Sequence, residues 1–180
     1  MAEVARDAEM PNIRAERFAL LTGPHTCYKC SADTRVSAIG LADYDALGEE
    51  GYELVEDCVL FTQLGSLGVA AMNAVSTLVP WMRFNHSMTA NATYLANHCE
   101  HCDALIGAWY IAEPGEAFFP QSEEEMSRLT VDWIDQPFKT ADVGGMQSSW
   151  IDQLLAPDRP NRKPRRRSRR HDQRDPTGSG

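Results

Sequence analysis

Two cysteine pairs with the same spacing carry the clearest chemistry in this 180-residue chain. Cys27 and Cys30 form one CxxC pair, and Cys99 and Cys102 form a second pair after 68 intervening residues. The CxxC spacing lets one tight backbone turn direct two sulfurs at one ion, and zinc prefers four ligands in a tetrahedron. Each pair is therefore half of a zinc site, and together they predict one site of four thiolates.

A shell of four thiolates leaves no coordination position for a catalytic water, so we expect the zinc to be structural. Its binding free energy, roughly 10–16 kcal/mol for structural zinc, is then available to folding. A rubredoxin-like iron site would use the same four ligands. A thioredoxin-type redox role is disfavoured, because the sequence lacks the βαβ pattern in which such motifs occur.

The residues that follow the two pairs also suit metal-binding turns. Ser31 follows the first pair and Asp103 follows the second, and both are small or compatible with a turn. In such turns the backbone amides point at the thiolates, and the residue after the second cysteine often has a positive φ angle. Asp tolerates that backbone conformation better than most residues.

Three histidines lie close to the cysteines in the sequence. His25 and His98 precede the two turns, and His101 lies inside the second turn. Because four sulfurs already complete the shell, we expect the histidines to lie beside the ligands or on the surface. The fifth cysteine, Cys58, belongs to neither CxxC pair and to no catalytic motif, so we expect a small buried hydrophobic residue.

The segments next to the cysteine pairs predict short strands. Residues 35–40 have strand-like composition, and residues 48–51 predict a turn bounded by glycines. Residues 94–97 and 105–111 flank the second pair, and the latter segment is rich in aromatic and β-branched residues. These two segments predict a hairpin with a metal-binding turn at its tip.

The run from Val59 to Met82 contains no charged residue and predicts a helix that Pro80 ends or kinks. Its length also invites a transmembrane interpretation. Against that interpretation, the run contains polar side chains, and a single span would place the two cysteine pairs on opposite sides of a bilayer. We therefore expect a buried core helix. Its apolar stripe consists of Leu60, Leu64, Leu67, Ala71, Val75 and Leu78.

Two shorter helices are also expected. Ser122 is a suitable N-cap, and the three glutamates after it favour a helix over residues 123–129. Residues 1–20 are expected to be loosely ordered, with a short helix near Ile13–Leu20.

Charge is distributed unevenly along the chain, whose net charge is −9. Residues 157–180 contain nine Lys or Arg and three Asp, whereas residues 1–156 contain eight basic and 23 acidic residues. The tail has no aliphatic residue after Ala156, so it cannot bury enough apolar surface and is predicted to be disordered. The acidic body repels nucleic acid and the tail attracts it. The candidate contacts in the tail are Arg162, Lys163, Arg165, Arg166, Arg167, Arg169 and Arg170.

The N-terminal residues are charged where a signal peptide would need an apolar run. We therefore expect a cytoplasmic protein. In a reducing compartment, five cysteines indicate metal ligands or thiols rather than a disulfide framework.

The surroundings of both cysteine pairs resemble a known group of proteins. Cys27-Tyr-Lys-Cys30 is followed by a V-x-A-I strand, and the second pair lies in Tyr94-x-Ala-Asn97-x-Cys99-x-x-Cys102-x-Ala-Leu-x-Gly107. These patterns resemble poorly characterised bacterial zinc-ribbon proteins, in which a variable insertion separates two cysteine turns. The resemblance implies zinc and a zinc-ribbon fold. We expect an α+β chain with a zinc-ribbon domain over residues 21–156, a helical insertion at about residues 41–92 and a disordered tail over residues 157–180. The group has no settled activity.

We therefore expect a non-enzymatic zinc-binding protein that binds a macromolecule, with a protein partner for the acidic body and nucleic acid as a candidate for the tail. The sequence contains none of the motifs GxxxxGK[ST], GxSxG or HExxH. One alternative is an enzyme that uses acids such as Glu53, Asp57 or Glu125. Another is an acidic inhibitor that mimics nucleic acid.

Overall fold

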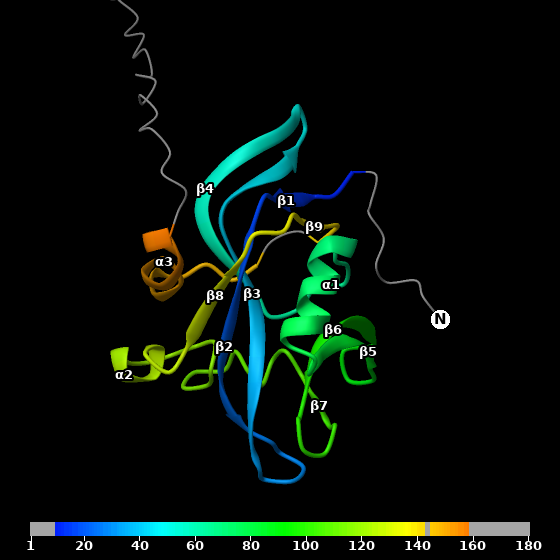
Figure 1. Ribbon diagram of the computed structural model, residues 1–180, viewed down its shortest axis with the longest axis vertical. Helices are drawn as coiled ribbons and strands as arrows, with labels where there is room; N and C mark the ends of the chain where they lie inside the picture. Colours follow the sequence, from blue (N-terminus) through cyan, green and yellow to red (C-terminus); the bar gives the residue numbers. More distant parts are fainter. Residues whose placement is uncertain (1–9, 143–144, 159–180) are drawn as a thin grey trace, which may run out of the picture.

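A computed structural model describes residues 10–142 and 145–158, which form mostly β-structure in two antiparallel sheets (Figure 1). The larger sheet contains β1 (Ile13–Ala15), β2 (Phe18–Thr26), β3 (Asp33–Gly48), β4 (Gly51–Phe61), β8 (Thr130–Ile134) and β9 (Phe138–Thr140). The smaller sheet contains β5 (Met82–Ser87), β6 (Ala92–His98) and β7 (Leu105–Ile106). The larger sheet has the order β8-β2-β3-β1-β9, with β4 also paired to β3, and the smaller sheet has the order β5-β6-β7.

The long strand β3 organises the larger sheet. It pairs antiparallel with β2, β1 and β4. Every residue from Val36 to Ala42 is buried, because the strand is covered on both faces. A continuous run of apolar and small residues is what such a doubly covered strand requires.

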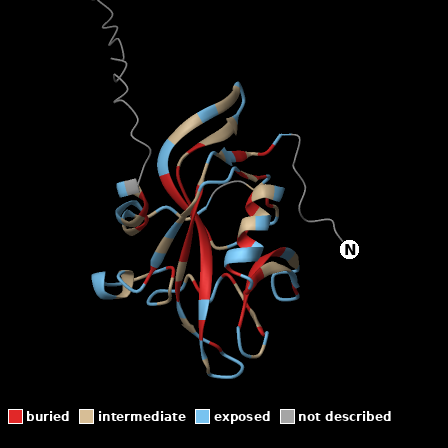
Figure 2. Ribbon diagram, in the orientation of Figure 1, coloured by how far each residue is buried: buried red, intermediate tan, exposed pale blue. Residues whose placement is uncertain are grey.

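Two hydrophobic clusters lie on opposite faces of the larger sheet. On one face, Phe18 and Leu20 pack with α1 (Val69–Leu78) and with the smaller sheet. On the other face, Ala19 and Leu21 pack with α3 (Ser149–Leu155) and with the segment around α2 (Glu123–Met126). A 3₁₀ turn, η1 (Ala156–Asp158), follows α3. Figure 2 shows the buried residues concentrated along β2 and β3, between these two layers.

The predicted helix over Val59–Met82 is wrong over much of its length. Residue Phe61 still belongs to β4, α1 covers Val69–Leu78, and Met82 begins β5. The chain turns before α1 because the backbone amides of Gly65 and Ser66 donate hydrogen bonds to the carboxylate of Asp142, far along the chain. The uncharged run therefore contains the end of β4, a ten-residue helix and the first residue of β5 rather than one long helix.

None of the helices in the described residues has the length and apolar character needed to cross a bilayer.

The insertion expected to be helical, residues 41–92, is mainly β-structure with α1 as its helix. The second half of β3 and all of β4 form a long hairpin that closes at the predicted turn, where Gly51 has a φ angle of 116°. Only glycine adopts that conformation without strain, which explains the glycine at this position. The α+β expectation thus gives way to a mostly β fold.

The short helix expected near Ile13–Leu20 is absent from the described residues of the N-terminal segment. Residues 1–9 lie outside the described residues, but residues 13–15 and 18–20 belong to β1 and β2 and not to a helix. Four consecutive apolar residues from Phe18 to Leu21 are buried on alternating faces, which suits a doubly covered strand. The seven candidate nucleic-acid contacts between Arg162 and Arg170 lie outside the described residues as well.

The helix predicted over residues 123–129 is confirmed in a shorter form, as α2. The side chain of Ser122 accepts a hydrogen bond from the backbone amide of Glu125, as expected of an N-cap.

Candidate metal centre

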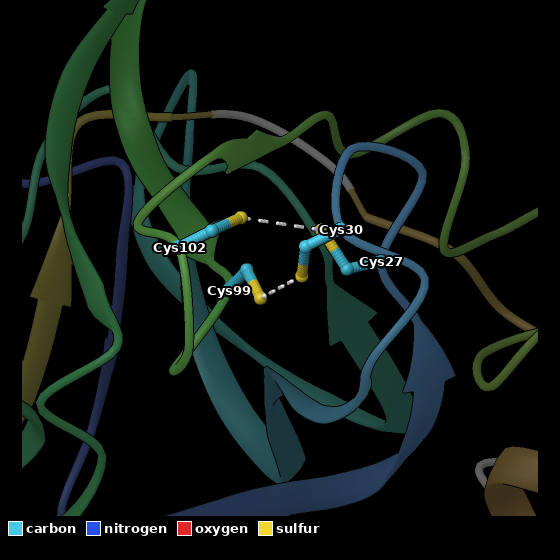
Figure 3. A group of neighbouring side chains, drawn as sticks. All are labelled: Cys27, Cys30, Cys99 and Cys102. Carbon is cyan, nitrogen blue, oxygen red and sulfur yellow. Dashed lines mark hydrogen bonds between the residues drawn. The ribbon is translucent and has the colours of Figure 1, made fainter.

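The fold brings the two cysteine pairs together. Figure 3 shows the side chains of Cys27, Cys30, Cys99 and Cys102 converging, and their sulfurs all lie within 4.8 Å of one another. The Cys27–Cys102 and Cys30–Cys99 sulfur separations are both 3.7 Å. Zinc–sulfur bonds of about 2.3 Å in a regular tetrahedron give sulfur–sulfur edges of about 3.8 Å. Two of the sulfur–sulfur separations therefore match this edge length, and all four sulfurs are close enough together to surround one ion.

The first cysteine turn joins β2 to β3. The backbone amide of Cys27 donates to the carbonyl of Ala32 at 2.9 Å, and the amide of Ser31 donates to the carbonyl of Cys27 at 2.8 Å. Ser31 has a φ angle of 57°. This left-handed residue turns the chain back on itself so that both sulfurs point the same way.

The second cysteine turn repeats this geometry between β6 and β7. The amide of Cys99 donates to the carbonyl of Ala104 at 2.9 Å, and the amide of Asp103 donates to the carbonyl of Cys99 at 2.9 Å. Asp103 has a φ angle of 58°. The predicted left-handed residue and the predicted hairpin with a cysteine turn at its tip are both confirmed. The strand after the turn is shorter than predicted, because residues 107–110 form another turn.

The four thiols differ in how far they are buried. Cys27 and Cys99 are buried, Cys30 is exposed and Cys102 is half-buried. Burial opposes ionisation of Cys99, but hydrogen bonds from the backbone amides of His101 and Cys102 outweigh it and lower its pKa to about 6. The amide of Cys30, ahead of other contributions, lowers the pKa of Cys27.

Cys102 resists ionisation. The amide of Ala104 lowers its pKa, but burial and the three neighbouring sulfurs act more strongly together and raise the pKa to about 12. A further negative charge so close to the other sulfurs is unfavourable unless a cation offsets it. A divalent cation at the centre of the cluster supplies that counterion, so the donor set suits zinc.

The nearby histidines make other contacts. His101 is exposed, and its Nε2 donates to the backbone carbonyl of Asp33 at 2.9 Å. His98 is buried, with Nδ1 3.2 Å from the carbonyl of Ala96 and Nε2 3.0 Å from the side-chain amide of Asn85. Burial is the main cause of the lowered pKa of His98, so the neutral ring is favoured. Nδ1 of His25 lies 3.0 Å from a carboxylate oxygen of Glu116. The histidines thus lie beside the cysteine cluster and are not part of it.

Sequence reasoning missed a buried asparagine whose side chain connects β6 of the smaller sheet to β3 of the larger sheet. The side-chain oxygen of Asn97 accepts a hydrogen bond from the backbone amide of Ser37 at 2.7 Å, and its nitrogen donates to the carbonyl of Ser37 at 2.9 Å. Both residues are at most 1% exposed. A polar residue in the otherwise apolar segment Tyr94-Leu-Ala-Asn97 was the signal available in the sequence.

A second missed contact is an ion pair between the two turns. The guanidinium of Arg35 donates to the two carboxylate oxygens of Glu100 at 2.7 and 3.1 Å, and the Arg35 backbone amide donates to the same carboxylate at 3.2 Å. The hydrogen bonds from Arg35 lower the pKa of Glu100. The backbone amide of Glu100 donates in turn to the hydroxyl of Thr34 at 3.1 Å.

The remaining sequence candidates lie elsewhere. Cys58 is buried in the second hydrophobic cluster, as predicted. Glu53 and Asp57 lie on β4, whereas Glu125 lies on α2, a different part of the molecule in Figure 1. These three acids do not converge on a common site.

No family model matches the chain, and no curated protein or solved structure matches it either. The cysteine cluster and its surroundings are therefore the basis for a functional proposal.

Proposed function

We propose that the chain is a zinc-binding protein in which Cys27, Cys30, Cys99 and Cys102 hold one structural zinc ion. The observation that supports this most strongly is the approach of four sulfurs from distant parts of the chain to within 4.8 Å, with two separations of 3.7 Å. Four thiolates form a closed shell without a position for a reacting water, which favours a structural over a catalytic role.

In this proposal the zinc ties the two sheets together. One ligand pair follows β2 of the larger sheet and the other follows β6 of the smaller sheet. An ion bound by both pairs closes a loop of 68 intervening residues in the folded chain. Because the ion binds the folded chain and not the separated halves, its binding free energy stabilises their contact. The proposal includes the resemblance of both cysteine pairs to those of zinc-ribbon proteins.

We further propose that the protein acts by binding a macromolecule rather than by catalysis. Each of the five arginines in the described residues pairs with a carboxylate, at distances up to 3.8 Å. Because acidic residues in the body outnumber basic ones by 23 to eight, the body keeps an excess of negative charge, which suits a partner with a basic surface. Nucleic acid is a second candidate, through the nine basic residues after residue 156.

Metal analysis of the purified protein tests the zinc proposal. The wild type should contain about one zinc per chain, and Cys99→Ser should lose it. Cys58→Ser is the matched control, because it removes a buried thiol that is not one of the four clustered cysteines. This variant should retain the zinc. Iron in place of zinc would indicate a rubredoxin-like centre. Loss of metal in Cys58→Ser alone would contradict the ligand assignment.

The choice between partners is tested by a truncation after Ala156. The full chain and the truncated chain are titrated into labelled DNA and RNA at several salt concentrations. If the tail binds nucleic acid, the full chain should bind with a slope of log K against log salt of roughly −4 to −5 for about five phosphate contacts, and the truncated chain should not bind. Equal binding by both chains would place the contact on the body and contradict the proposal. Absence of binding by both would favour a protein partner.

A further inference from the structure

The two cysteine turns are connected by a set of polar contacts that involves no cysteine sulfur. We define this set as the inter-turn clamp. On the first hairpin it consists of Asp33, Thr34, Arg35 and Ser37, and on the second it consists of Asn97, Glu100 and His101. We propose that the clamp positions the two cysteine turns for the metal, so that the metal-free chain already holds its four thiols close together. This inference rests on the proposed zinc function and adds the residues that prepare the site.

The buried part of the clamp fixes the approach of the two strands. Asn97 lies two residues before Cys99, and its amide group bonds to both the amide and the carbonyl of Ser37. The hydroxyl of Ser37 also accepts from the indole nitrogen of Trp81 at 3.2 Å and lies 2.8 Å from the hydroxyl of Thr22. Sliding of β6 along β3 would leave several buried polar groups without partners, which is costly. These contacts therefore fix the position of β6 relative to β3 without a metal.

The outer part of the clamp fixes the orientation of the second turn. Glu100 lies between the two cysteines of that turn, and its two-point pairing with Arg35 constrains the carboxylate in both position and direction. The guanidinium of Arg35 also lies 4.1 Å from the ring centroid of Trp81. Since Trp81 bonds to Ser37, the inner and outer parts of the clamp form one connected unit.

Two other ion pairs provide comparisons. Arg83 pairs with Asp103, but this contact joins the second turn to β5 within the same sheet. Arg14 pairs with Asp45 at 3.1 Å and lies 3.8 Å from the ring centroid of Tyr52, in a part of the larger sheet away from the cysteine turns. Arg14 thus reproduces the chemistry of Arg35, an ion pair and an aromatic contact, without connecting the two turns.

Zinc affinity measured by competition with a chromophoric chelator tests the proposal. Loss of residues that orient metal ligands typically lowers metal affinity 10- to 100-fold. Glu100→Ala and Arg35→Ala should each weaken zinc binding by about that factor, and the double variant should be little worse than either single variant. Arg14→Ala should bind zinc like the wild type. Cobalt(II) bound to Glu100→Ala should still give the absorption of a tetrahedral four-thiolate site, because all four ligands remain.

The far-ultraviolet circular dichroism of each metal-free protein is measured in the same experiment, and the wild type should keep its β-sheet signal. If Glu100→Ala fails to fold, the same comparison is made with Glu100→Gln, which keeps the size of the side chain and removes its charge. If wild-type protein binds no zinc, the proposed function fails. If the wild type binds zinc and the clamp variants bind it as tightly as Arg14→Ala, the zinc function stands and the positioning role is wrong. Unfolding of the wild type on metal removal would also overturn the preformed site.

Discussion

The two cysteine turns share their local structure but differ in what supports them. Both have the pattern C-x-x-C followed by Ser or Asp and then Ala, with the same pair of backbone hydrogen bonds and φ angles of 57° and 58°. The first turn joins strands of nine and 16 residues within the larger sheet. The second turn joins a strand of seven residues to a strand of two residues.

This difference indicates that the second turn has less support from its own hairpin than the first, so contacts with the first turn matter more to it. The pairing of β6 with β7 involves two residue pairs, and that of β2 with β3 involves eight. Fewer hydrogen bonds within its hairpin leave the second turn closer to local unfolding. The inter-turn clamp and the proposed zinc ion supply the missing support.

Removal of the metal should have the largest effect, and it should affect the second turn more than the first. We expect chelation to lower the free energy of unfolding by about 5 kcal/mol or more, because a structural zinc ion stabilises only the folded chain. In hydrogen–deuterium exchange, amides of residues 99–106 should lose protection more than amides of residues 27–34. Equal loss in both turns would contradict the difference in support.

Asn97→Ala should have the next largest effect. It leaves a buried amide and a buried carbonyl of Ser37 without their partners, at about 1–3 kcal/mol for each group. We expect urea denaturation of the zinc-bound protein to show a loss of about 2–6 kcal/mol. Asn73→Ala, at an exposed position on α1, is the control and should change stability by less than about 0.5 kcal/mol. Similar losses in both variants would mean that the buried amide has no special role.

Glycine substitutions after the two pairs should have the smallest effects and should differ in size. Ser31→Gly removes a side chain from a left-handed position and should stabilise the protein by about 0.5–1 kcal/mol, after allowance for the greater freedom of glycine in the unfolded chain. Asp103→Gly should stabilise less, because Asp tolerates this conformation better and because it loses the pair with Arg83. Thermal unfolding of both zinc-bound variants checks the order, and a larger gain for Asp103→Gly would contradict it.

The local features of the cysteine turns and of α2 could be predicted because each depends on neighbouring residues. The CxxC spacing, the left-handed residue after each pair and the N-cap at Ser122 each depend on a few consecutive residues. The hairpin around the second pair follows for the same reason.

The remaining features depend on partners that are distant in the sequence. The run after Val59 has the periodicity of a helix, and it is divided instead by hydrogen bonds from Gly65 and Ser66 to Asp142, which lies 76 residues beyond Ser66. The clamp joins Ser37 to Asn97 across 60 residues. Neither pairing leaves a periodic pattern in the sequence, because it involves single polar residues whose partners are set by the tertiary fold.

Above all, we propose that one zinc ion is held by four thiolates, two from each turn. X-ray absorption at the zinc edge of the purified wild-type protein tests it most directly. We predict a shell of four sulfur atoms at about 2.3 Å, with no nitrogen or oxygen ligand, in a protein that contains about one zinc per chain. A mixed shell that includes nitrogen at about 2.0–2.1 Å would bring a histidine into the site and contradict the closed four-thiolate centre.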